Sequence, residues 1–306
     1  MAELAAIILA HNNPPQVRRL INALAGLDIF LHCDLRTPRD VFEQMTADAS
    51  SRVHTIERRR TTLASWSLVE AELAGLRAAL EHSSAEHILV LSGTCYPLVS
   101  MSELHADLTQ WRGRTRMQMI PVPFDWWSSP RNPDGGMWRF RRRFVTIRDQ
   151  TIFVGRVPLR TYKRPIPGEL RLIASQQWKI CARAHAEVAL QVLDDRPDLV
   201  RFWRTTFVPE ESALASILAS PELVGAVSEE VLDDLPWWAD WSTGTGHPRW
   251  LDVDDFPVLE AARFATPRDP DAVPDRNDGI EYRSLFARKL TPDLRLADLI
   301  DERLRG

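Results

Sequence analysis

The stretch AAIILAHNNPPQVRRLINALAGLDIFLHC, residues 5–33, carries two short apolar runs on either side of a segment with helical spacing. The runs at 5–10 and 29–33 have the length and composition of buried strands. Between them, from 15 to 27, apolar residues recur every three or four positions, which predicts an amphipathic helix. A strand, a helix and a second strand in this order form the repeating unit of a parallel sheet with crossover helices.

The same alternation continues through the first third of the chain. The patterns predict helices over 38–47 and 67–81 and strands over 53–55 and 87–91. We therefore expect an α/β fold with a mixed, mainly parallel sheet flanked by helices. Ligands of such sheets bind beyond the carboxyl ends of the strands. The turns expected to line a site follow three of the predicted strands, at 11–14, 34–36 and 92–97.

Residues 111–168 differ from this pattern, because they are rich in Arg, Pro and Trp and predict irregular structure with short strands. A long loop in a compact domain is usually functional or disordered, and the aromatic content here favours order. Three of its tryptophans would either stack on a sugar or simply pack together, and four arginines lie close by. These residues are Trp126, Trp127, Trp138, Arg139, Arg141, Arg142 and Arg143. Further along, regular structure is predicted at 172–178, with helices over 182–193 and from about Glu210.

Size and charge limit the classes of protein to which the chain can belong. With 306 residues, of which 44% are hydrophobic, it can bury a full core as one large domain or two small ones. A formal net charge of -4 argues against nucleic acid or an anionic membrane as its main partner. Local basic clusters remain compatible with that charge.

Cysteine usage and hydropathy indicate the cellular compartment in which we expect the protein. Cys33, Cys95 and Cys181 are widely spaced and odd in number, which fits a reducing cytoplasm better than a disulfide framework or a zinc site. No basic leader precedes the first predicted strand, and no run approaches the roughly 20 apolar residues of a membrane helix. We therefore expect a cytoplasmic protein with no membrane span.

Several common catalytic motifs are missing from the sequence. It has no glycine-rich dinucleotide fingerprint, no phosphate loop and no Gly-x-Ser-x-Gly elbow. The acid-x-acid pattern that often binds a metal occurs only at 252–254 and 269–271, late in the chain, and we interpret both as surface acids. The segment FVPEE, residues 207–211, reads as a helix start, so helix capping is one explanation for Glu210 and Glu211.

Short blocks along nearly the whole chain carry a family resemblance. In their order and spacing they are similar to the core-2/I-branching β-1,6-N-acetylglucosaminyltransferases and peptide xylosyltransferases of glycosyltransferase family 14. The chain resembles a soluble, bacterial-type member of that family. The blocks are ILAHNNP (8–14), LHCD (31–34), ASWSLVEAEL (64–73), LSGTCYPL (91–98), SQQW (175–178), FVPEE (207–211), DW (240–241) and LFARKL (285–290).

The resemblance implies a fold and a reaction. The fold would be GT-A-like, or Rossmann-like, in a single domain over 1–306, with a nucleotide-binding half at 1–110 and an acceptor-binding and catalytic half at 111–306. The reaction would be inverting and would need no divalent metal and no cofactor beyond the nucleotide-sugar donor. We expect transfer of N-acetylglucosamine from its UDP conjugate to a hydroxyl of a glycan or small-molecule acceptor, forming a β-linkage. A UDP-xylose-type transferase and a non-catalytic sugar- or nucleotide-binding protein remain the alternatives.

The resemblance also places the reacting groups. The family's Pro-acid-Glu pattern makes Glu211 the base that takes the proton from the acceptor hydroxyl. Lys289 matches the lysine that contacts the diphosphate. Its neighbour Arg288 is expected to contribute less, because adjacent side chains seldom face one pocket. Arg249 is the nearest candidate for a second cation, with a solvated surface charge as the alternative.

The donor and acceptor sites are assigned from the remaining blocks. For the nucleotide, Asp34 would accept hydrogen bonds from uracil or ribose, unless it only caps its loop with Arg36. Ser65 and Trp66 would lie beside the donor, unless they serve as helix cap and core. Cys95 and Gln176 stand where relatives carry Asp, and Gln176 favours a donor other than UDP-xylose. The other candidates are His11 and Asn12 for the nucleotide, and Gly93, Gln177, Trp178 and Trp241 for the sugars.

Overall fold

The computed structural model describes residues 3–47, 49–130, 132–155, 157–244, 247–264 and 283–306. Its centre is a seven-stranded sheet in the order β16-β6-β15-β4-β1-β2-β3. Strands β3, β2, β1 and β4 are parallel neighbours, whereas β15 is antiparallel to both β4 and β6. The expected mixed, mainly parallel α/β sheet is confirmed. The strands are β1 (Leu4–Ala10), β2 (Asp28–Cys33), β3 (Val53–Thr55), β4 (His87–Ser92), β6 (Thr115–Met117), β15 (Lys179–Ala182) and β16 (Val231–Asp233).

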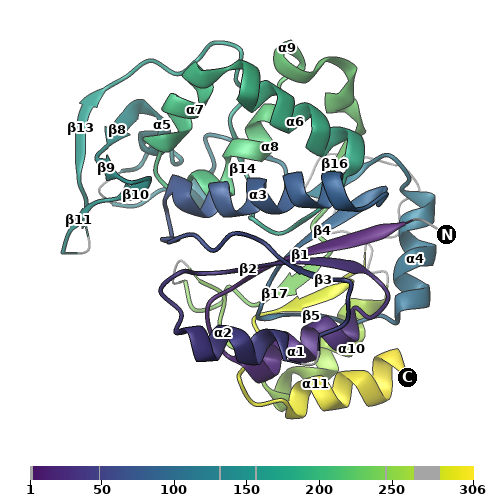
Figure 1. Cartoon of the computed structure of the whole chain (residues 1–306). Coiled ribbons are helices and arrows are strands. Elements are labelled where there is room, and N and C mark those ends of the chain that lie inside the picture. The colour runs from purple at the N-terminus through teal and green to yellow at the C-terminus, as the bar shows by residue number, and fades with distance from the viewer. Residues whose placement is uncertain (1–2, 48, 131, 156, 245–246, 265–282) are drawn as a thin grey trace.

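Helices cover both faces of this sheet (Figure 1). Every residue of β1 is buried, and alternate residues belong to the hydrophobic cores on opposite faces, because neighbouring side chains of a strand point in opposite directions. One core includes α1 (Pro14–Ala23), α2 (Arg39–Thr46), α4 (Met101–Gln110), α10 (Phe256–Arg263) and α11 (Arg295–Ile300). The other includes α3 (Trp66–His82), α6 (Arg183–Asp195), α7 (Pro197–Arg204), α8 (Ala213–Leu218) and α9 (Pro221–Val224).

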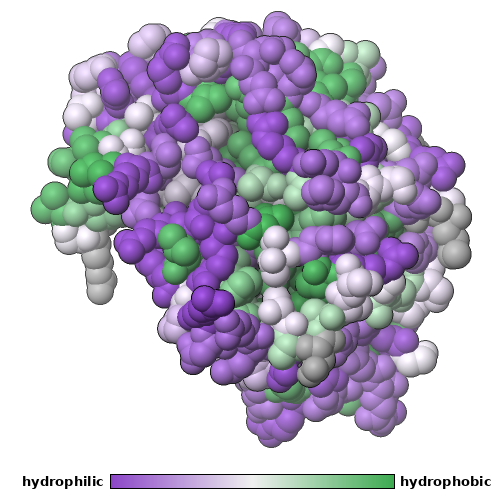
Figure 2. All heavy atoms as spheres, in the orientation of Figure 1, coloured by the Kyte–Doolittle hydropathy of each residue, from purple (hydrophilic) through white to green (hydrophobic). Residues whose placement is uncertain are grey.

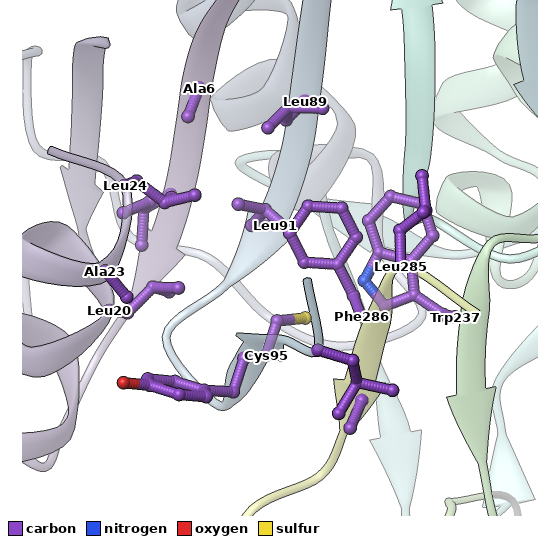
Figure 3. Close-up of a cluster of buried hydrophobic side chains, with 14 of the residues drawn as sticks. Ala6, Leu20, Ala23, Leu24, Leu89, Leu91, Cys95, Trp237, Leu285 and Phe286 are labelled. Carbon is purple, nitrogen blue, oxygen red and sulfur yellow. The ribbon is translucent and has the colours of Figure 1, made fainter. Parts of the chain in front are cut away.

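A second, three-stranded sheet brings the end of the chain against the first half. It has the order β17-β18-β5, with bounds Trp237–Ala239, Phe286–Arg288 and Cys95–Pro97. Trp237 and Phe286 stack with ring centroids 4.8 Å apart. Figure 3 shows both rings beside Leu91 of β4, with Leu20 and Leu24 on the other side of the cluster. This packing fixes β18 next to the end of β4.

Residues 138–163 form short ladders that project from the body. They comprise α5 (Trp138–Arg141) and six strands that lie at one side of the molecule in Figure 1. The strands are β8 (Arg142–Phe144), β9 (Thr146–Ile147), β10 (Gln150–Thr151), β11 (Phe153–Val154), β12 (Val157–Pro158) and β13 (Arg160–Lys163). Nearby, β7 (Ile120–Pro121) pairs with β14 (Ile173–Ala174). The predicted irregular segment with short strands is confirmed.

Some element boundaries differ from the predictions. The first helix ends at Ala23 rather than at residue 27, because Gly26 adopts a φ of 94° that breaks the helix. The predicted helix near Glu210 is only a single 3-10 turn, η2 (Pro209–Glu211), and α8 begins at Ala213. Regular structure at 172–178 is limited to the two residues of β14. None of the helices in the described ranges is long and apolar enough to cross a bilayer.

Both expected halves of the chain contribute to the central sheet, since β6, β15 and β16 follow residue 110. Of the two acid-x-acid segments, Asp252 and Asp254 are exposed, as expected, and Asp252 caps the turn η4 (Val253–Asp255). The other segment, 269–271, lies outside the described residues.

Candidate active site

The carboxyl ends of β1, β2 and β4 meet at one edge of the sheet, as the strand order requires. The N–H of Asp34 donates to the carbonyl of Ala10 at 3.0 Å, and the N–H of Gly93 donates to Leu9 at 3.0 Å. The Thr37 hydroxyl donates to the His11 carbonyl at 2.7 Å. The predicted site turns at 11–14, 34–36 and 92–97 are therefore brought together.

Gly93 lies at this close approach and leaves little room for a side chain. A Cβ at this position would lie 3.0 Å from a methyl carbon of Val17 and 3.3 Å from the Cβ of Ala10. Both contacts are tighter than side chains normally make. A larger residue would require Val17, Ala10 or the turn after β4 to shift by a few tenths of an ångström.

Arg288 reaches the same edge from β18. The Leu290 N–H donates to the Thr94 carbonyl at 3.1 Å, which fixes the end of β18 beside the turn after β4. The Arg288 guanidinium donates to the hydroxyls of Ser92 and Thr94, and it lies 4.1 Å from the centroid of the Trp178 ring. No described carboxylate forms an ion pair with Arg288, and burial lowers its pKa. It is a partly buried cation whose hydrogen-bond partners are neutral hydroxyls.

The charges of Lys289 and Arg288 both affect His247, although we expected from the sequence that two adjacent side chains would face different regions. Burial lowers the pKa of His247, and the charges of Lys289 and Arg288 lower it further. Lys289 also lowers the pKa of His11, after the larger effect of burial. The Lys289 ammonium lies 3.9 Å from the centroid of the Trp250 ring. The two cations therefore share a positive field at the edge where β1, β4 and β18 end.

Cys95 lies in β5 directly opposite Arg288. Its sulfur accepts a hydrogen bond from the Ser92 N–H at 3.4 Å and is in contact with the Arg288 guanidinium. An aspartate here, as the family resemblance would lead one to expect, would neutralise Arg288. The cysteine leaves that charge uncompensated.

Glu211 lies in η2, next to the SQQW segment. Its carbonyl accepts a hydrogen bond from the Ser175 N–H at 2.8 Å. A nitrogen of Arg139 lies 3.5 Å from Glu211 Oε2, and the same guanidinium stacks on Trp127 at 3.9 Å. Burial raises the pKa of Glu211, while the nearby charges of Arg139 and Arg288 act against that rise. A partly exposed carboxylate with a raised pKa is suited to accept a proton.

The turn that carries Glu211 is strained. Val208 has a φ of 54°, in the left-handed region that β-branched residues avoid. Strain of this kind costs on the order of 1–3 kcal/mol and concentrates at functional sites. The arrangement places Glu210 and Glu211 in different surroundings.

Glu210 is buried and faces the start of α3. Its Oε1 accepts a hydrogen bond from the Ala64 N–H at 2.7 Å, and Oε2 has no hydrogen-bond partner among the described residues. Burial, and then the charge of Glu211, raise the pKa of Glu210 to about 8. Glu210 is therefore largely protonated at neutral pH. It holds Ala64, which has a φ of 61°, rather than facing the sheet edge.

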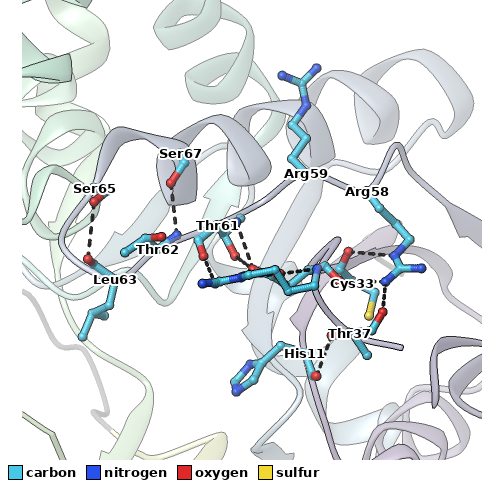
Figure 4. A network of polar contacts seen from close by, with 12 residues as sticks. His11, Cys33, Thr37, Arg58, Arg59, Thr61, Thr62, Leu63, Ser65 and Ser67 are labelled. Atoms are coloured by element: carbon cyan, nitrogen blue, oxygen red, sulfur yellow. Dashed lines mark hydrogen bonds and ion pairs between the residues drawn. The ribbon is translucent and has the colours of Figure 1, made fainter. Parts of the chain in front are cut away.

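The Asp34 carboxylate is engaged by its own loop and by Thr61, which follows β3 and belongs to the polar network in Figure 4. Its carboxylate accepts hydrogen bonds from the Arg36 N–H and side chain and from the Thr61 N–H and hydroxyl, at 2.6–3.0 Å. These bonds overcome the effect of burial and hold the pKa of Asp34 well below its ordinary value. The hydrogen bonds with Arg36 are those expected if Asp34 caps its loop. A role in nucleotide binding stays a prediction.

Ser65 and Trp66 support the fold around α3. The Ser65 hydroxyl accepts a hydrogen bond from the Thr151 N–H at 2.7 Å, so it ties α3 to β10 rather than capping its own helix. Trp66 is buried, and its indole N–H donates to Glu70 at 3.0 Å. His11 and Asn12 are exposed at the sheet edge.

The side chains of the SQQW segment point to two different regions, one beside Arg288 and one beside α3. Trp178 lies under Arg288, and a buried oxygen of Gln176 has no partner among the described residues. Gln177 instead points toward α3, where its amide lies 3.4 Å from Glu72 beside the buried Lys179–Glu72 ion pair. The structure therefore separates Gln177 from the cations at the sheet edge.

Arg249 is tied to carboxylates. Its guanidinium forms ion pairs with Asp240 and Asp255, which link three segments near the second sheet. The Arg249 side chain is 35% exposed, and its part in diphosphate binding stays a prediction. Trp241 is half-buried directly after Asp240. Its distance to the cations is not set by any described contact.

Sequence reasoning missed several residues of this region. Arg139 was part of a conspicuous arginine cluster, but nothing local indicated that it would meet Glu211. Ser92 and Thr94 lay within the quoted LSGTCYPL block without being singled out. Trp250 and His247 carried no recognisable signal, since only the return of β18 to the first half places them beside Lys289.

Comparison with known proteins identifies relatives of the chain. The family model described as "Branch: Core-2/I-Branching enzyme" matches residues 7–261. No curated protein matches the chain significantly.

Three solved structures resemble the chain distantly. Mouse xyloside xylosyltransferase 1 in its apo form has 11% identity and a TM-score of 0.37, over 79% of this chain and 90% of that one. A glucose-1-phosphate thymidylyltransferase from Bacillus anthracis, described as putative in its title, has 10% identity and a TM-score of 0.32, over 61% and 75%. HddC from Yersinia pseudotuberculosis has 9% identity and a TM-score of 0.29, over 61% and 79%. Likeness at this level assigns no activity.

Proposed function

The chain belongs to the Core-2/I-Branching enzyme family and is thus a glycosyltransferase, and from this premise we propose that it is an inverting, UDP-sugar-dependent enzyme with Glu211 as its base. The acceptor hydroxyl oxygen attacks the anomeric carbon of the donor sugar. The bond from that carbon to the diphosphate breaks on the opposite face, and the hydroxyl proton passes to Glu211. The product has the inverted, β configuration, and UDP is the second product.

The observation that carries this proposal is the pairing of a raised-pKa carboxylate with a partly buried cation that forms no ion pair among the described residues. Glu211 and Arg288 are close enough for their charges to influence each other's pKa. Partial burial without a counter-ion is unfavourable for a charge, so Arg288 favours an anionic ligand. A diphosphate would supply the missing charge, and a sugar between the two groups would meet a base on its other face.

Arg288 and Lys289 would stabilise the leaving group. Negative charge grows on the diphosphate as the glycosidic bond breaks, and fixed cations in a partly desolvated site stabilise that charge without reorganising. Arg288 is held in place by Ser92, Thr94 and Trp178. We propose that these cations do the work for which other transferases use a divalent metal. Arg249, already paired with two carboxylates, would serve the fold instead.

For the donor we propose UDP-N-acetylglucosamine. Gln176 supports this choice, because its buried amide oxygen has no described partner and would accept the N–H of an acetamido group. A UDP-xylose donor would leave that oxygen unsatisfied. The acceptor is a glycan or small molecule whose hydroxyl reaches Glu211.

A donor panel tests the proposal. UDP release is measured with UDP-N-acetylglucosamine, UDP-glucose, UDP-galactose and UDP-xylose. We expect the fastest release with UDP-N-acetylglucosamine and retention of that preference in the presence of simple glycoside acceptors. UDP binding without turnover of any donor would instead favour a non-catalytic binding protein on the same scaffold.

A further inference from the structure

The projecting segment 138–164, here called the basic lobe, has a charge opposite to that of the remaining chain. It contains nine basic residues and one acidic residue, a net charge of +8. Because the whole chain carries -4, the remainder carries -12. Such asymmetry indicates a surface that meets an anionic partner.

The cations of the basic lobe are available for such a partner. Five of them are exposed and form no ion pair with a carboxylate among the residues that the structure describes. They are Arg141, Arg143, Arg148, Arg160 and Lys163. Arg143 donates to the Tyr162 hydroxyl, and Arg160 to the Asn132 side chain, both neutral groups. Some exposed arginines elsewhere are paired, such as Arg77 with Asp194 and Arg295 with Asp293, but the unpaired ones outside the lobe are scattered along the chain rather than gathered in one short segment.

Apolar side chains are exposed among these cations. Val154 and Val157 face each other across the β11–β12 hairpin and are 67% and 53% exposed, and Ile147 in β9 is 61% exposed. Phe153, Leu159 and Tyr162 are also exposed. Figure 2 shows a hydrophobic area on the part of the surface where Figure 1 places β11 and β13.

Aromatic packing and backbone hydrogen bonds hold the basic lobe in place. At its base, Phe144 and Trp138 each lie 5.2 Å from the Phe207 ring centroid. The backbone of Ile152 bonds to both Val145 and Leu159, at 2.9 and 2.8 Å. Phe207 belongs to the segment that carries Glu211, so the lobe and the proposed base share one support.

We propose that the basic lobe docks onto an anionic lipid surface. Its exposed arginines and Lys163 contact lipid phosphates, and the hairpin side chains enter the apolar edge of the bilayer. Aliphatic groups such as Val154 and Val157 neither stack on bases nor bind sugars through hydrogen bonds, so a soluble polyanion would leave them in water. Docking would place the proposed active site next to the membrane, without any membrane-spanning helix.

Vesicle co-sedimentation of the whole chain tests the proposal. We expect binding at least about tenfold stronger to phosphatidylcholine vesicles with about 30% phosphatidylglycerol than to pure phosphatidylcholine, with loss at high salt. The variant Arg143→Gln/Arg148→Gln/Lys163→Gln should lose at least about tenfold of this binding. Its control, Arg39→Gln/Arg77→Gln/Arg295→Gln, changes the net charge equally outside the lobe and should bind like the parent.

A second pair of variants tests the apolar contribution. Val154→Ser/Val157→Ser should weaken binding at least about fivefold, whereas Val258→Ser/Phe264→Ser, which removes exposed apolar groups elsewhere, should not. Thermal unfolding of each variant checks that it folds, and UDP release checks the separate proposal on catalysis. Absence of binding to the anionic vesicles overturns the proposal, as does equal loss in the control variants. Lobe-dependent binding to heparin without vesicle binding would assign the surface to a soluble polyanion instead.

Discussion

Glu210 accepts a hydrogen bond from the backbone N–H of Ala64 at 2.7 Å, and so turns away from the sheet edge where Arg288 and Lys289 lie. The adjacent acids of the FVPEE segment therefore have separate tasks. Glu210 joins two segments that are 146 residues apart, and Glu211 remains next to Arg139.

Substitution of Glu210 should affect stability more than catalysis. Glu210→Gln keeps an oxygen that can accept the Ala64 N–H, so we expect kcat within about threefold of the parent. Glu210→Ala removes the acceptor and should destabilise the fold by about 1–3 kcal/mol. Thermal unfolding and UDP release together check this. Loss of turnover in Glu210→Gln, with Glu211→Gln active, would show that Glu210 rather than Glu211 is the base.

Glu210 should also make stability depend on pH. Its pKa is raised from 4.5 to about 8 on folding, so the folded state holds its proton more tightly than the unfolded state. The resulting stabilisation is complete below pH 4.5 and is lost as the pH rises through about 8. The Tm of the parent should decline over that range more steeply than the Tm of Glu210→Gln. Parallel curves for the two proteins would contradict this.

Activity should fall on the acid side as Glu211 becomes protonated. Because burial raises the pKa of Glu211, the acid limb of the kcat/KM profile should lie above 4.5, the ordinary value for glutamate. Weakening the opposing charge in Arg139→Gln should move this limb to higher pH. A limb that stays in place in that variant would show that another group controls it.

Removal of the proposed diphosphate cations should weaken UDP binding. We expect Arg288→Gln and Lys289→Gln each to raise the Kd for UDP at least about tenfold, as for loss of a charge-assisted contact. Arg295→Gln, an exposed cation paired with Asp293, is the control and should bind UDP normally. Arg249→Gln should lower the Tm rather than the affinity. Unchanged UDP affinity in both Arg288→Gln and Lys289→Gln would exclude their assigned role.

Chelation tests the proposal that Arg288 and Lys289 take the place of a divalent metal. UDP release should continue unchanged after dialysis against EDTA, because Arg288 and Lys289 are part of the chain. Titration with manganese or magnesium should then raise the rate less than about twofold. Strict dependence on added metal would overturn this part of the mechanism.

Local patterns in the sequence predicted much of the fold. The β1–α1–β2 unit follows from apolar spacing within 30 residues, and the FVPEE and LFARKL blocks drew attention to Glu211 and Lys289 before any geometry was known. Irregular structure with short strands was predicted for the basic lobe, but two-residue strands such as β11 and β12 have no such period, so their pairing was not predictable.

Long-range pairing decided what the sequence left open. Arg288 faces Ser92 because β18 pairs with β5, placing Arg288 opposite Cys95. Gln177 turns toward Glu72 on α3, and Arg249 meets Asp240 and Asp255 only after the chain has folded. None of these contacts can be predicted from the residues next to each position in the sequence.

The kcat of Glu211→Gln with saturating UDP-N-acetylglucosamine and a hydroxyl acceptor tests the central claim most directly. Glutamine keeps the size of the side chain but cannot take the acceptor proton, so we predict that kcat falls at least about a hundredfold while the Kd for UDP stays within about twofold. A kcat close to that of the parent, with UDP binding intact, would contradict the assignment of Glu211 as the catalytic base.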